Sequence, residues 1–139
     1  MSEPTIVTQR ADELIADDIR HLIATYPPLA ADRTAIQWSV QDGAVTATGH
    51  VMSANTRHFF LSGLQAIPGV SSIDAERLYD DNAVRLDVSR ILPPGLQANV
   101  RHGYVILSGE HPADMSIEAI ADRILALPGV LKVVSGFGG

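Results

Sequence analysis

The stretch DGAVTATG at residues 42–49 recurs as HGYVILSG at residues 102–109. At the same spacing, IPGV at 67–70 recurs as LPGV at 127–130. The glycines of the two copies therefore stay in register: Gly43, Gly49 and Gly69 in the first, and Gly103, Gly109 and Gly129 in the second. Such a pattern predicts an internal duplication, so the fold of the chain follows from what one copy can form.

Each copy predicts a β-hairpin. Asp42-Gly43 is a strong turn signal, because a tight turn of the correct twist needs positive φ at both central positions. Ile36, Trp38 and Val40 alternate with polar residues before the turn, as in a strand with one buried face. Gly49 falls within the predicted second strand, and glycine at such a position indicates a bulge or a close backbone approach. We interpret all six repeated glycines as structural residues.

Helices are predicted on either side of the first hairpin. Asp12 is expected to begin a helix with one apolar stripe, which Pro27-Pro28 then stops. Ser53 is a suitable cap for a second helix that continues through Ala66. A third strand is expected over 70–78 after Pro-Gly.

The second copy repeats this order, with a first helix ended by Pro93-Pro94 and a last strand expected over 130–137. The predicted fold class is α+β: two tandem αββαβ units, each a three-stranded mixed sheet with two helices packed on one face. We divide the chain into a lead-in (1–11), a first unit (12–79) and a second unit (80–139). The second unit has a shortened first helix and six residues fewer between its Pro-Pro pair and its hairpin. Units of about sixty residues bury little surface alone, so we expect them to pack against each other.

Composition excludes several classes of function. The 139 residues carry a net charge of −6 without a basic stripe, which disfavours nucleic acid as a partner. The absence of cysteine excludes disulfides and thiolate metal sites. No apolar run approaches the ~20 residues of a membrane span, and the first residues lack a basic-then-apolar signal. As written, the chain is expected in the cytoplasm; removal of a signal or anchor would place it in the periplasm or cell envelope.

No catalytic motif is present in the sequence. The five histidines have no metal-binding spacing such as HExxH, and no serine lies in a nucleophile elbow. No glycine-rich phosphate loop follows a strand. We therefore predict a non-enzymatic protein without a metal site or a cofactor.

One face of the second sheet differs from its counterpart. Tyr104 and Ile106 stand where the first copy has Ala44 and Thr46, and Leu131 stands where it has Ser71. An outward sheet face with apolar residues marks a contact. We expect the first unit to cover this face, and a second protomer or another protein is the alternative.

The turn-Gly-Val-x-x-x-Gly hairpins, the IPGV and LPGV segments and the segment DDIRHLIATYPPL resemble the BON (bacterial OsmY and nodulation) domain, here in two tandem copies. The resemblance covers nearly the whole chain. It implies a non-enzymatic module that binds phospholipid membranes or other components of the bacterial cell envelope, in envelope integrity or osmotic stress.

Three hypotheses for function follow. In the first, the chain binds phospholipid or an envelope protein, and the candidate membrane contacts are Phe59, Arg85, Arg90, Leu92 and Leu96. In the second, it is a structural module that forms homo-oligomers through the apolar outer sheet face. In the third, it is a cytoplasmic sensor of a small ligand or an ion.

Overall fold

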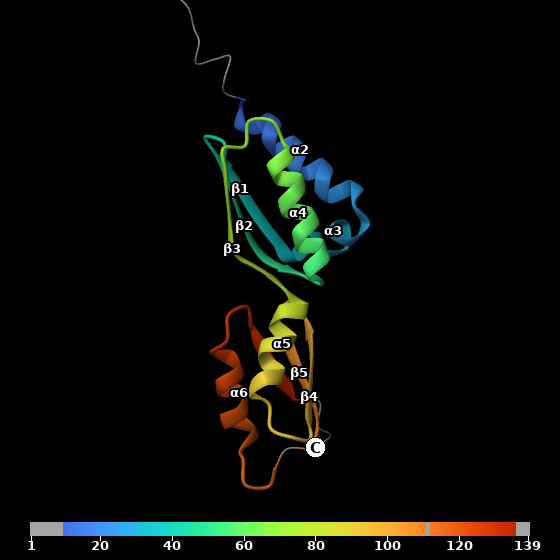
Figure 1. The fold of residues 1–139 in the computed structure, drawn as a ribbon, viewed down its shortest axis with the longest axis vertical. Coiled ribbons are helices and arrows are strands. Elements are labelled where there is room, and N and C mark those ends of the chain that lie inside the picture. Colours follow the sequence, from blue (N-terminus) through green and yellow to red (C-terminus); the bar gives the residue numbers. More distant parts are fainter. Residues whose placement is uncertain (1–9, 111, 136–139) are drawn as a thin grey trace, which may run out of the picture.

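The computed structural model describes residues 10–110 and 112–135, which form two α+β units stacked end to end (Figure 1). The first unit consists of α2 (Asp12–Thr25), α3 (Pro27–Asp32), the 3-10 turn Arg33–Ala35, β1 (Ile36–Gln41), β2 (Ala44–Val51), α4 (Ala54–Ala66) and β3 (Ser72–Asp80). The second consists of α5 (Asp81–Ile91), β4 (Leu96–Arg101), β5 (Tyr104–Gly109), α6 (Ile117–Leu125) and β6 (Lys132–Ser135). Strand β3 leads directly into α5, so no linker separates the units.

Each unit contains one three-stranded mixed sheet. The strand orders are β1-β2-β3 and β4-β5-β6, and in each sheet the first two strands pair antiparallel and the last two parallel. Together with the five helices of the described chain, this confirms the predicted α+β class and the tandem arrangement of its elements.

The hairpin turns form as the sequence predicts. Asp42 and Gly43 have φ of 51° and 82°, and His102 and Gly103 have φ of 47° and 84°. Positive φ at both central positions defines the two-residue turn whose twist matches that of the flanking strands. The register is the same in both units, because Val40 pairs with Val45 and Val100 pairs with Val105.

The glycines at the ends of β2 and β5 allow two backbone segments to approach closely. Gly49 has φ of 107°, and a Cβ there would collide with the carbonyl oxygen of Ala35. Gly109 has φ of 96°, and a Cβ there would collide with the carbonyl oxygen of Gly95. The predicted close approach is therefore confirmed in both copies.

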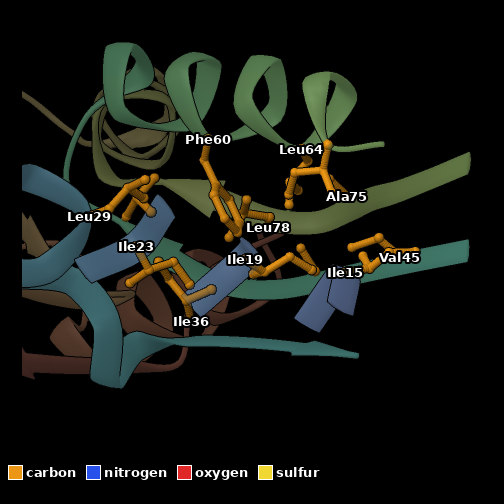
Figure 2. Packing of buried hydrophobic residues seen from close by; sticks show 13 residues of the cluster. Ile15, Ile19, Ile23, Leu29, Ile36, Val45, Phe60, Leu64, Ala75 and Leu78 are labelled. Atoms are coloured by element: carbon orange, nitrogen blue, oxygen red, sulfur yellow. The ribbon is translucent and has the colours of Figure 1, made fainter. Parts of the chain in front are cut away.

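Each unit has its own hydrophobic core. In the first, Figure 2 shows Phe60 of α4 pointing toward Ile19 of α2, and Ile15 of α2 beside Val45 of the sheet. In the second, the corresponding layer is smaller and lies between α5, α6 and the inner face of the sheet. Its buried members are Val84, Val88, Leu96, Val100, Val105, Leu107, Ile120 and Ile124.

The structure differs from the prediction after the first helix. Helix α2 ends at Thr25, but Pro27-Pro28 then begin the additional helix α3. Proline is compatible with the first turn of a helix, where its missing N–H needs no partner. The third strand covers 72–80 rather than 70–78, and β6 covers 132–135 of the predicted 130–137, of which 136 and 137 lie outside the described residues.

Replacing Gly49 by alanine is expected to destabilise the protein by at least about 2 kcal/mol, because the new Cβ meets backbone at a φ that side chains rarely adopt. Urea denaturation monitored by circular dichroism measures this loss. Thr48→Ala, one residue earlier in the same strand, is the matched control and should cost less than about 1 kcal/mol. Equal losses in the two variants would contradict the steric account.

Candidate interaction surface

The first helix of each unit holds the hairpin turn through an aspartate. The carboxylate of Asp12 accepts hydrogen bonds from the backbone N–H of Asp42 at 2.8 Å and of Gly43 at 3.0 Å. In the second unit, Asp81 accepts from His102 N–H at 2.7 Å and from the following glycine N–H at 3.3 Å. Helix α2 begins at Asp12 as predicted, and Ala11 holds the N-cap position without a side-chain bond.

A second repeated contact fixes how α2 corresponds to α5. The glycine of the first Pro-Gly-Val segment packs against Arg10 and Ile15, and that of the second packs against Tyr79 and Val84. Together with the two aspartates, these contacts align the start of α2 with the start of α5. The contact from aspartate to turn glycine spans 31 positions in the first unit and 22 in the second, a difference of nine. The nine residues that the second unit lacks correspond to α3 and the 3-10 turn of the first.

His50 links the two units at the end of the first sheet. It lies on the outer face of that sheet, opposite Tyr79, and is buried. Its Nε2 donates a hydrogen bond to the carbonyl oxygen of Gly129 at 2.8 Å. A Cβ on Gly103 would lie 2.6 Å from this nitrogen. Gly103 therefore makes room for a side chain of the first unit, and Gly129 supplies the acceptor of its hydrogen bond.

A second link joins His102 to the additional helix of the first unit. His102 Nε2 donates to Asp32 Oδ1 at 2.7 Å, and the other carboxylate oxygen accepts from Met52 N–H at 3.0 Å. The Asp32 side chain is only 2% exposed, so both contacts are shielded from water. Nearby, Asn82 of α5 accepts from the N–H of Ala54 at the start of α4 at 3.1 Å. Hydrogen bonds from three side chains therefore fasten the units together.

The outer face of the second sheet remains uncovered. Tyr104 and Ile106 are 47% and 38% exposed, so the expectation that the first unit packs on them is wrong. The physical reason is that the units meet through the hairpin end of the second sheet. Leu131 is exposed too, but it lies before the start of β6, two residues from Val133, which faces inward and pairs with Val105. Leu131 is therefore not part of the outward face. Val134, which pairs with Ile106, completes the outward apolar face instead.

The candidate membrane contacts are distributed over both units. Phe59 on α4 stacks on Tyr26 with ring centroids 3.6 Å apart and remains partly exposed. Arg85 on α5 is exposed without an ion pair among the described residues, whereas Arg90 pairs with Asp87 at 3.2 Å. Leu92 is half-buried, and Leu96 is buried in the second core and unavailable at the surface. Arg85 and Leu92 line one groove, Arg90 is not part of it, and Phe59 belongs to the other unit.

Sequence reasoning missed a groove between α5 and the edge strand β4. It encloses about 630 Å³. Its lining combines one arginine with apolar and uncharged polar residues: Asn82, Arg85, Leu86, Ser89, Leu92, Pro93, Pro94, Leu96, Gln97 and Ala98. The signal that could have found it is the exchange of Trp38 for Ala98 between the two repeats.

The described part of the chain contains no group of three or more histidine, aspartate or glutamate side chains placed to hold a metal ion. Within residues 10–110 and 112–135, no helix has the length and apolar character needed to cross a membrane. One of the five histidines, His111, lies outside the described residues. Every buried polar side-chain atom of the described residues has a hydrogen-bond partner.

Comparisons with known proteins identify the class of the first unit. A BON domain is detected at residues 11–76. No curated protein matches the chain. Among solved structures, CdsD, a structural protein of the type III secretion system of Chlamydia trachomatis, is similar at 12% identity and a TM-score of 0.40, covering 88% of this chain and 90% of that one. A structure of the CdsD C-terminal domain is similar at 12% identity and a TM-score of 0.36, covering 94% and 100%.

Replacing His102 by alanine is expected to destabilise the protein by about 1–3 kcal/mol, because it leaves the buried Asp32 carboxylate with one fewer hydrogen bond. Thermal or urea unfolding measures the change. His58→Ala removes an exposed histidine from α4 and should change stability by less than about 0.5 kcal/mol. Similar small losses in both variants would show that the link contributes nothing to stability.

Proposed function

We propose that this chain is a non-catalytic binding module of the bacterial cell envelope, which attaches to phospholipid or to another envelope component. The BON domain detected at 11–76 supports this reading. The second unit repeats the order of elements, the hairpin turns and the aspartate contact of the first. We include it in the proposal as a second BON copy.

The exposed side of α5 carries this proposal. Arg85 is exposed on this helix, and beside it Leu86 is 54% exposed. Leu92 follows at the end of the helix and is half-buried. An exposed arginine attracts anionic head groups by about 1 kcal/mol, and adjacent apolar side chains can enter the boundary between head groups and acyl chains.

The net negative charge of the chain limits which part of the protein can approach an anionic membrane surface. The chain carries −6, so anionic lipid repels the molecule as a whole. Attachment must therefore depend on a local basic site, and it must weaken as salt screens the charges over about 10 Å. Arg85 suits this role better than Arg90, because Asp87 already neutralises the latter.

Co-sedimentation with phospholipid vesicles tests the attachment. The protein is expected to sediment with anionic vesicles at low salt, less at moderate salt, and weakly with neutral vesicles. Arg85→Glu should weaken retention about tenfold, because a charge reversal removes one attraction and adds one repulsion. Arg20→Glu, an equal charge change on exposed α2, is the control and should leave retention unchanged.

Two results would contradict this assignment. Absence of retention at any salt would exclude phospholipid as a partner of the isolated chain. Retention that is independent of salt and of Arg85 would instead place the contact at an apolar anchor, for which Phe59 is the candidate.

Self-association is a second candidate function, and the uncovered outer face of β5 and β6 favours it. Tyr104, Ile106 and Val134 are exposed side by side through strand pairing. If copies of the chain pair there, Ile106→Thr, the change toward the first copy, should lower the mass measured by analytical ultracentrifugation to that of a monomer. A monomeric wild-type protein at high micromolar concentration would exclude this function.

A further inference from the structure

The groove between α5 and β4 has an equivalent in the first unit, between α2 and β1. Asp12 and Asp81 make the same contact with their turns, so residues at equal distances after them correspond. Trp38 and Ala98 occupy the same register in their hairpins, opposite Ala47 and Leu107. The two grooves can therefore be compared residue by residue within one molecule.

In the first unit, side chains of the chain itself fill this groove. The indole of Trp38 lies in it, and the guanidinium carbon of Arg20 lies 5.5 Å from the ring centroid. The remaining space is about 350 Å³. An arginine above the face of an indole is a favourable cation–π arrangement, so this groove is narrowed by its own residues.

In the second unit, both of these side chains are truncated. Ala98 replaces Trp38, Ser89 replaces Arg20, and the open space increases to about 630 Å³. Leu86 and Leu92 supply an apolar part of its lining. The larger open space therefore lies where an aromatic side chain stands in the other unit.

The charge of the groove also changes between the copies. Glu13 and Asp17 line the first groove, and their equivalents in the second are Asn82 and Leu86. Arg85 stands where the first unit has Ala16. Among the described residues, the second groove is lined by one cation and no carboxylate. It is therefore complementary to an acidic ligand in a protein that is acidic overall.

The strand beside the groove has an open edge. Among the described strands, β4 pairs only with β5, and of its outward amides those of Leu96 and Val100 already donate to Pro93 O and Asn99 Oδ1. The two-residue turn makes the residues that flank it a hydrogen-bonded pair, and bonded and non-bonded pairs alternate from there. Ala98 and Leu107 form a non-bonded pair, so the N–H and C=O of Ala98 point to the open edge. An added strand would therefore pair with the residue on the floor of the groove.

We propose that the α5–β4 groove binds an extended segment of a partner protein, which adds a strand to β4, places an aromatic side chain above Ala98 and directs a carboxylate to Arg85. This is β-strand addition, in which backbone hydrogen bonds supply affinity and a pocket for alternate side chains supplies specificity. The proposal goes beyond lipid attachment and is tested independently of it.

A phage-displayed library of random twelve-residue peptides is the probe. It is selected on the immobilised full chain, and the peptides recovered are then measured individually by fluorescence polarisation. Binders are expected to contain an aromatic residue with an acidic residue nearby. Ala98→Trp gives the groove the residue of the first unit and should weaken their binding at least tenfold. Ser89→Arg, at the exposed rim, is a second blocking variant that keeps the core unchanged.

Ser108→Trp is the matched control, because it adds the same side chain at an exposed position on the opposite face of the same sheet, outside the groove. It should bind the recovered peptides as the wild type does. Thermal unfolding establishes that each variant is folded, and Ala98→Trp is expected to melt no lower than the wild type, since the indole fills open space.

Several outcomes would overturn the proposal. Recovered peptides whose binding is unchanged in both Ala98→Trp and Ser89→Arg do not use the groove. Failure to recover any peptide would also overturn the proposal. Vesicle retention that falls with Ala98→Trp would show that lipid occupies the groove instead. If vesicle retention depends on Arg85 and not on Ala98, the lipid proposal stands even where the peptide proposal fails.

Discussion

The rest of the structure depends on one contact: the carboxylate at the start of the first helix and the two backbone amides of the hairpin turn. Asp12 and Asp81 make it in their respective units, at distances between 2.7 and 3.3 Å. Hydrogen bonds to a charged acceptor are stronger than neutral ones. They set the position of the helix relative to the edge strand, and thereby the groove between the two.

On this shared frame the two copies have diverged in complementary ways. The first keeps the additional helix α3, which supplies Asp32 to the contact with His102, and Trp38 narrows its groove. The second lacks that helix, and its turn glycines pack against the first unit instead. Its groove is open and free of carboxylates. The two units thus share one frame but differ in the groove beside their first helix.

Local patterns allowed the hairpins, the second helix and the duplication to be predicted from sequence, because turn chemistry and capping act within a few residues. The contacts between units were not predictable in this way. Nothing near His50 or His102 indicates a partner far away in the chain. Pro27-Pro28 was interpreted only as a stop, although proline also begins helices, and Leu131 was assigned to the outer face without knowledge of where β6 begins.

The most direct test of this account compares the two equivalent grooves in one experiment. Isotope-labelled full-length protein is titrated with N-acetyl-L-tryptophanamide, which carries the side chain that fills the first groove, and backbone amide shifts are recorded. The account predicts saturable shifts at Ala98 and along α5, without shifts at Trp38 and α2. Shifts around Trp38, or none at Ala98 at millimolar probe, would contradict the claim that the second unit carries the open binding site.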